Sequence, residues 1–122
     1  MIVDDHKVFR RGLHSLLGTQ PGWEIVGDAA DGAEAVRKAN QLKPDVVIMD
    51  ISMPMMSGLD ATRLIMEAAP ETKVLIFSML DSEQMKRDAL EAGARGYVLK
   101  SHAASDLIAA IRAVSCPFAK AA

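Results

Sequence analysis

Short runs of consecutive apolar residues alternate along the chain with apolar residues at helical spacing. Apolar runs of this length are typical of strands that are buried on both faces, as in a parallel sheet. We therefore predict five strands. The runs cover residues 2–3, 23–30, 46–49, 74–77 and 97–99.

The second pattern places apolar residues three, four or seven positions apart, which gives one apolar stripe along a helix. It is clear over residues 9–17, 61–68 and 107–114, and weaker over 35–39 and 85–92. Glycine and proline fall between the patterns, where they end helices and form turns. Five alternating strand and helix units predict an α/β fold: a doubly wound, five-stranded parallel sheet with helices on both faces.

Length and composition fit one globular domain. The chain has 122 residues, half of them apolar and a quarter charged, with a net charge of −2. This size is typical of a single domain. The last helical pattern ends near Ser115, so we expect a domain over residues 1–115 and a C-terminal tail over 116–122.

The same composition argues against several classes of protein. No apolar run approaches the about 20 residues that span a bilayer, and no basic segment precedes an apolar stretch as in a secretory signal peptide. The net charge of −2 lacks the basic excess of a domain that binds nucleic acid directly. The one cysteine, Cys116, cannot form an intrachain disulfide, which favours a cytoplasmic location.

Polar residues follow four of the five predicted strands. The first strand is followed by Asp4 and Asp5, the third by Asp50, the fourth by Ser78 and the fifth by Lys100. In open α/β sheets, ligands bind beyond the carboxyl ends of the strands, where the strand order reverses. We therefore expect these five side chains at one edge of the sheet, in one site.

The residue types at this edge predict a phosphate and metal site. Crowded carboxylates raise one another's pKa unless a cation lies among them, and Mg²⁺ prefers oxygen ligands. Lys100 suits a phosphate oxygen, and Asp50 is a carboxylate nucleophile that can accept a phosphoryl group. Each aspartate alone is more often a helix cap or a turn residue. The five together favour the site.

Five motifs, in this order and at this spacing, carry a family resemblance. They are Val3-Asp4-Asp5-His6, Ile48-Met49-Asp50, Met53-Pro54-x-Met56-Ser57-Gly58-Leu59, Ser78-Met79 and Ala92-Gly93-Ala94-Arg95-Gly96-Tyr97-Val98-Leu99-Lys100. Over nearly its full length the chain resembles the receiver domain of two-component response regulators. The first, fourth and fifth motifs further resemble the NarL/FixJ (LuxR-type) subgroup, whose full-length members usually carry a C-terminal helix-turn-helix domain.

The resemblance implies a fold and a phosphoacceptor. The fold is the flavodoxin-like (βα)₅ three-layer sandwich with strand order 2-1-3-4-5. Asp50 would accept a phosphoryl group from a histidine kinase or a phosphotransfer protein. Asp4, Asp5 and Asp50 would bind Mg²⁺ together with the backbone carbonyl of Ser52, and Lys100 would pair with Asp50 or its phosphate.

The resemblance also implies a switch and an output. Ser78 would be the switch hydroxyl and Tyr97 the switch aromatic, with the readout on the fourth helix, fifth strand and fifth helix. Such a module is no enzyme for external substrates, because it catalyses only its own phosphorylation and slow dephosphorylation. The expected output is transcriptional control through a helix-turn-helix effector domain, which we expect to lie outside this chain. A homodimer remains open.

Two other functions stay open as alternatives. A small Mg²⁺-dependent phosphatase of the haloacid dehalogenase type also uses an aspartyl nucleophile, but its motif is Asp-x-Asp after the first strand, whereas Ile51 and Ser52 follow Asp50. A flavodoxin-like cofactor binder needs a phosphate loop rich in Ser, Thr and Gly. Residues 4–7, Asp-Asp-His-Lys, would repel a phosphate unless a metal is bound.

Two further features concern the start of the chain and the loop after Lys100. Only three residues precede the acidic pair, so we expect a first strand that is short or truncated. Ser101 follows Lys100 where many receivers have a cis proline, so we expect a trans peptide bond. His6 is placed to flank the acidic pocket.

Overall fold

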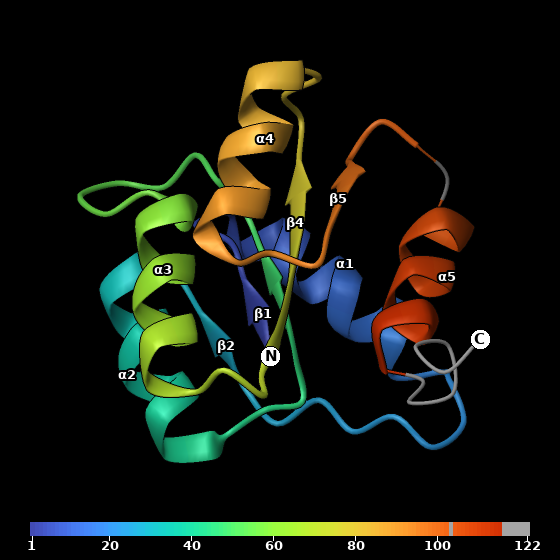
Figure 1. Cartoon of the computed structure of the whole chain (residues 1–122). Coiled ribbons are helices and arrows are strands. Elements are labelled where there is room, and N and C mark those ends of the chain that lie inside the picture. Colours follow the sequence, from blue (N-terminus) through green and yellow to red (C-terminus); the bar gives the residue numbers. More distant parts are fainter. Residues whose placement is uncertain (103, 116–122) are drawn as a thin grey trace.

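The computed structural model of the chain describes residues 1–102 and 104–115. The predicted tail, residues 116–122 with Cys116, lies outside the described residues, as does Ala103. Five strands alternate with five helices, as predicted (Figure 1). The elements are β1 (Ile2–Val3), α1 (Lys7–Leu17), β2 (Asp28–Ala29), α2 (Gly32–Leu42), β3 (Val46–Met49), α3 (Gly58–Ala68), β4 (Lys73–Ser78), α4 (Glu83–Ala92), β5 (Gly96–Leu99) and α5 (Ala104–Ser115).

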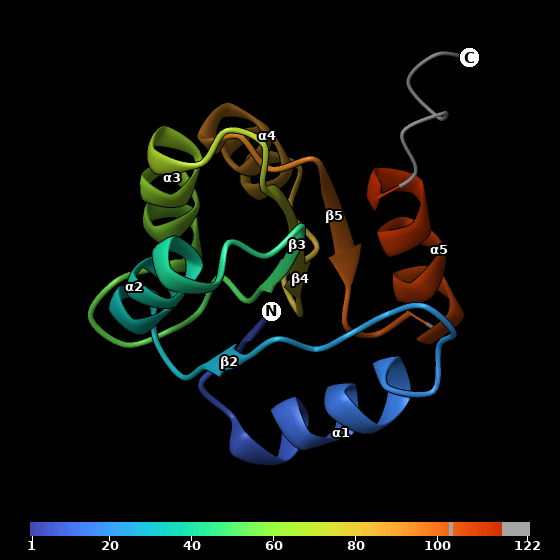
Figure 2. The ribbon, with the colours of Figure 1, turned by 90° about the horizontal axis from the view of Figure 1, so that it is seen from below.

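The strands form one parallel sheet in the order β2-β1-β3-β4-β5, which confirms the predicted topology. The first strand lies between the second and the third, since Ile2 pairs with Asp28 on one side and Ile48 on the other. Helices α1 and α5 cover one face of the sheet, and α2, α3 and α4 cover the other (Figures 1 and 2). The sheet order reverses between β1 and β3.

Two apolar layers hold the helices on the sheet. Alternate strand residues contribute to opposite layers, which is why the strand runs are apolar throughout. Val3, Met49 and Ile76 pack in the layer with α2, α3 and α4, while Ile2, Ile48 and Leu75 pack in the layer with α1 and α5. The apolar residues of β1 and β3 extend to Val3 and Met49, which directly precede Asp4 and Asp50.

The second strand is shorter than the predicted run over 23–30. Only Asp28 and Ala29 are paired, because the neighbouring β1 offers only Ile2 and Val3 as partners. Gly27 still contributes its carbonyl oxygen, which accepts a hydrogen bond from the Ile2 N–H at 3.1 Å. The number of paired residues in β2 is thus set by the length of β1. The apolar pattern of residues 23–30 gives no information about that length.

The helices begin and end at residues that commonly cap or terminate helices. Asp31, Ser57 and Ser82 cap α2, α3 and α4, each accepting a hydrogen bond from a backbone N–H in the first turn. Gly93 ends α4 with a φ of 106°, the left-handed conformation expected of a glycine at this place. The described residues contain no cis peptide bond, so the bond before Ser101 is trans as predicted. No described helix is both long enough and apolar enough to cross a membrane.

Candidate phosphate and metal site

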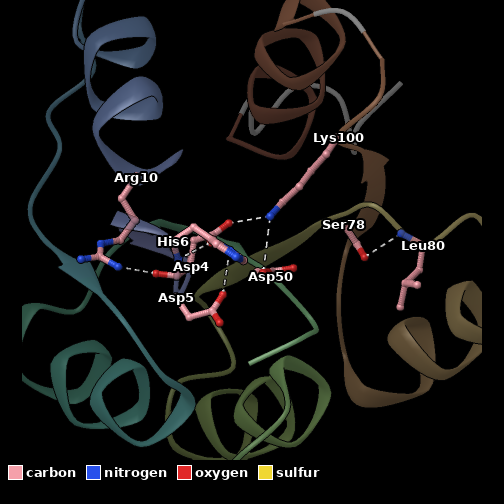
Figure 3. A network of polar contacts seen from close by, with 8 residues as sticks. All are labelled: Asp4, Asp5, His6, Arg10, Asp50, Ser78, Leu80 and Lys100. Carbon is pink, nitrogen blue, oxygen red and sulfur yellow. Dashed lines mark hydrogen bonds and ion pairs between the residues drawn. The ribbon is translucent and has the colours of Figure 1, made fainter. Parts of the chain in front are cut away.

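The parallel sheet brings the predicted polar residues together at one edge. Asp4 and Asp5 follow β1, Asp50 follows β3 and Lys100 follows β5 (Figure 3). Backbone hydrogen bonds hold the strand ends level, since the Asp4 N–H donates to Ala29 O at 3.1 Å and the Asp50 N–H donates to Val3 O at 3.0 Å. The carboxyl groups therefore sit side by side at the point where the strand order reverses.

Lys100 bridges two buried carboxylates. Its Nζ lies 2.6 Å from Asp4 Oδ2 and 3.4 Å from Asp50 Oδ2, and all three side chains are at most 7% exposed. The ring of Phe9 on α1 lies 4.2 Å from the same Nζ, so an aromatic face also contacts the ammonium. Asp5 adds a third carboxylate at the rim, where it is 28% exposed. One ammonium thus faces three carboxylates, and the pocket keeps an acidic excess.

Burial raises the pKa of the Asp50 carboxyl above its ordinary value. The Lys100 ammonium opposes this shift, while the neighbouring Asp4 carboxylate adds to it. The bridging lysine is therefore insufficient to offset the cost of a buried Asp50 anion. A further cation at this place would stabilise the anion.

The arrangement fits a divalent metal ion. Asp4, Asp5, His6 and Asp50 each offer one ligand atom, and these atoms lie within 4.8 Å of one another. Asp5 Oδ1 is buried yet accepts no hydrogen bond from the residues that the structure describes, which leaves a carboxylate oxygen available to a cation. Carboxylate oxygens are the ligands that Mg²⁺ prefers. Ser52 lies in the exposed loop after Asp50, and the role of its carbonyl stays a prediction.

The structure adds a contact on α1 that the sequence did not single out. Arg10 donates from Nη1 to the Asp4 carbonyl oxygen at 2.6 Å and from Nε to Asp28 Oδ2 at 3.2 Å. It thereby ties the end of β1 to β2, and Figure 3 shows its contact with Asp4. The signal in the sequence was a cation five residues beyond the acidic pair, near the start of the first helix, but such a cation is common on exposed helices.

Ser78 and Tyr97 are joined through one residue, Leu80. The Leu80 N–H donates to Ser78 Oγ at 3.1 Å, and the Tyr97 hydroxyl donates to the Leu80 carbonyl oxygen at 2.6 Å. Ser78 is buried at the end of β4, next to β3 in the sheet (Figure 3). The two predicted switch residues therefore share hydrogen bonds to the same backbone segment, a link that the sequence alone did not indicate.

Comparison with known proteins gives consistent matches. The family model described as the response regulator receiver domain matches residues 1–112. The chain is 48% identical to the oxygen regulatory protein NreC of Staphylococcus carnosus over 115 residues, covering 93% of this chain and 53% of the relative. It is 41% identical to the transcriptional regulatory protein DegU of Brevibacillus brevis, covering 94% of this chain and 49% of the relative.

Solved structures agree with the sequence matches. A LuxR-family two-component response regulator from Aurantimonas sp. SI85-9A1 superposes with a TM-score of 0.92 at 37% identity, covering 99% of this chain and 91% of that chain. The chain spans about half the length of the curated relatives it matches. The matches extend over the whole sheet and both helical layers, and we conclude that the chain belongs to the response regulator receiver domain family, in its NarL/FixJ (LuxR-type) subgroup.

Proposed function

We propose that this domain accepts a phosphoryl group on Asp50 and thereby switches a surface that a partner reads. The observation that carries the proposal is the bridge from Lys100 to two buried carboxylates at the sheet's reversal point. Burying an ion pair carries a desolvation cost, so a structural role alone is a weak explanation for the Lys100 ammonium between Asp4 and Asp50. The ammonium does suit the negative charge of an incoming phosphate.

The donor in this proposal is the phosphohistidine of a histidine kinase or of a phosphotransfer protein. An Asp50 carboxylate oxygen forms the new P–O bond while the P–N bond breaks, and the electron pair of that bond stays on the imidazole nitrogen, which takes up a proton. Lys100 binds a phosphoryl oxygen. Asp4 and Asp5, with Asp50 and the Ser52 carbonyl, would hold Mg²⁺, which would neutralise phosphate and carboxylate charge.

Ser78 and Tyr97 form the switch in this proposal. The phosphoryl oxygens offer the Ser78 hydroxyl a new acceptor, so that Ser78 Oγ turns away from the Leu80 N–H. The Leu80 segment then moves, and the Tyr97 hydroxyl loses the carbonyl to which it donates. A local change of charge thereby biases a two-state element.

The wider role rests on the relatives. We propose that residues 1–115 form the receiver unit and that a helix-turn-helix effector completes the full protein, because the regulators NreC and DegU are about twice as long as this chain. In this proposal the domain works in the cytoplasm, controls transcription, and catalyses only its own phosphorylation and slow dephosphorylation.

Phosphorylation in the test tube tests the core of the proposal. The protein is incubated with Mg²⁺ and acetyl phosphate, and its intact mass is measured. We expect the gain of one phosphoryl group that hydroxylamine removes and that the Asp50→Asn variant does not acquire. Multiple-turnover release of phosphate from unrelated monoesters would instead favour the phosphatase alternative.

A further inference from the structure

His6 is a side chain at the acidic pocket that the proposed function leaves unused. Its Nδ1 lies 3.1 Å from Asp5 Oδ1 and 3.3 Å from Asp4 Oδ1 (Figure 3). The His6 backbone N–H also donates to Asp4 Oδ1 at 2.8 Å, which fixes the backbone that carries the ring. The imidazole is therefore held at the pocket by its position immediately before α1.

These distances match neighbouring ligands of one metal ion. Bonds from zinc to imidazole nitrogen and carboxylate oxygen are about 2.0–2.2 Å long, so two ligands at adjacent positions are about 3 Å apart. The Asp5 Oδ1 atom that faces His6 Nδ1 accepts no hydrogen bond among the described residues. The ring nitrogen has a hydrogen bond with Asp4 Oδ1, whereas its approach to Asp5 is not a hydrogen bond and leaves that oxygen available to a metal ion.

We infer that His6 is a further metal ligand, which gives the pocket a nitrogen donor and an affinity for Zn²⁺-type transition-metal ions. The inference rests on the metal site of the proposed function and extends it to the choice of metal. Carboxylate oxygens suit Mg²⁺, whereas imidazole suits zinc, nickel and copper. With His6 the same three carboxylates serve both classes of ion, and zinc competes with Mg²⁺ for the pocket.

A metal titration of the metal-free full chain tests this inference. Isothermal titration calorimetry with Zn²⁺, and separately with Mg²⁺, compares the parent protein with His6→Ala. All proteins carry Cys116→Ser, because a thiolate is itself a zinc ligand. His14→Ala is the matched control, since His14 lies on α1 with its Nε2 3.8 Å from Asp28 and outside the group of four ligand residues.

We expect His6→Ala to weaken Zn²⁺ binding by at least about tenfold and to change Mg²⁺ binding by less than about threefold. His14→Ala should leave both affinities unchanged. The ring ¹⁵N spectrum of the parent should show Zn²⁺ shifting the His6 Nδ1 signal. The side chain of His6 is 73% exposed, so its removal costs little stability, and thermal unfolding checks this.

Either of two results overturns the inference: Zn²⁺ affinity that is unchanged in His6→Ala, or Zn²⁺ and Mg²⁺ affinities that fall together. Phosphorylation by acetyl phosphate with Mg²⁺ is measured on the same proteins. If the parent is phosphorylated but His6→Ala keeps its Zn²⁺ affinity, the inference is rejected and the proposed function stands. A parent that is never phosphorylated rejects the proposed function, whatever the zinc titration shows.

Discussion

At the residue scale, Lys100 stabilises two buried carboxylates at once. Its removal leaves the buried carboxylates of Asp4 and Asp50 without this cation. We predict that Lys100→Met lowers the free energy of unfolding by about 3 kcal/mol in metal-free buffer, as for other broken buried pairs. Urea unfolding in EDTA measures this, and millimolar Mg²⁺ should restore part of the loss.

The control for this variant is Lys86→Met. Lys86 also bridges two carboxylates, those of Asp81 and Glu83, but on the exposed side of α4. Exposed ion pairs contribute little, so we expect almost no change. Equal losses in the two variants would contradict the role assigned to Lys100.

The charge of Asp50 has the opposite effect on stability, because it destabilises the folded protein. Its pKa is raised in the folded state by burial, so the folded protein binds the proton more tightly than the unfolded chain does. Ionisation of Asp50 therefore costs stability above its folded pKa, and the cost vanishes as pH falls below the ordinary value of 3.8. We predict that Asp50→Asn in EDTA stabilises the protein at pH 7 by about 1 kcal/mol, or about 3–5 °C in Tm.

Thermal unfolding at several pH values checks this prediction. The gap in Tm between Asp50→Asn and the parent should be widest near neutrality and should close as the buffer is brought toward pH 4. A gap that stays constant over this range would show that an effect other than the Asp50 charge sets it.

The sequence identified residues whose place depends on topology alone. Asp4, Asp50 and Lys100 end parallel strands, and parallel strands bring their carboxyl ends to one edge in any such sheet. The contacts of Phe9 and Arg10 could not be predicted in this way. They depend on how α1 leaves β1, and the apolar spacing of a helix gives its buried face but not its direction over the pocket.

At the element scale, the start of α3 is packed against the loop that carries Asp50. Gly58 is the first residue of α3, and a Cβ there would lie 1.9 Å from the Asp50 carbonyl oxygen. The Gly58 N–H donates to the Ile51 carbonyl oxygen at 2.9 Å, so helix and loop cannot separate without losing this bond. We predict that Gly58→Ala destabilises the fold by about 1–3 kcal/mol and slows phosphorylation of Asp50.

Gly12 provides the matched control for this substitution. It lies inside α1, and a Cβ there would meet no atom within 4 Å. Gly12→Ala should therefore stabilise the protein by about 0.5–1 kcal/mol, as in other helix interiors, and leave phosphorylation unchanged. Chemical unfolding and the acetyl phosphate assay measure both variants, and a Gly58→Ala protein as stable and reactive as the parent would refute the packing argument.

The sequence predicted element boundaries best where they depend on interactions within one helical turn. The glycine of the left-handed turn and the side chains that cap helices act within one turn, so Gly93 marked the end of α4 correctly. Burial depends on more distant partners. Leu64 belongs to the predicted stripe over 61–68 but is 41% exposed, because Ala61 and Ile65 form the buried side of α3. The stripe shows which side is apolar but not how far the sheet reaches beneath it.

At the scale of the whole molecule, the site and the proposed readout surface are joined through one sheet. The pocket spans β1, β3 and β5, whereas Tyr97 projects from β5 toward the segment after β4. The α/β alternation predicted the shared edge of the sheet, and the family resemblance implied the strand order. It could not predict the path from pocket to surface, which depends on the two hydrogen bonds at Leu80.

The chain contains one tyrosine and one tryptophan, so Tyr97 reports on the surface end of that path and Trp23 reports on a part of the molecule outside it. Tyr97 donates to Leu80, while Trp23 precedes β2 and lies 5.9 Å from the guanidinium of Arg112 on α5. Protein labelled with 3-fluorotyrosine should give a single ¹⁹F resonance. We predict that acetyl phosphate and Mg²⁺ shift this resonance, because the ring loses its hydrogen bond to Leu80, while Trp23 emission stays constant.

Two variants decide whether Ser78 transmits the change. Asp50→Asn should abolish the ¹⁹F shift, since no phosphoryl group is acquired. Ser78→Ala should still be phosphorylated but should show a much smaller shift, because no hydroxyl remains to leave the Leu80 N–H for the phosphate. A full shift in phosphorylated Ser78→Ala would mean that Tyr97 responds to the charge on Asp50 by another route, and the coupling through Leu80 would then be wrong.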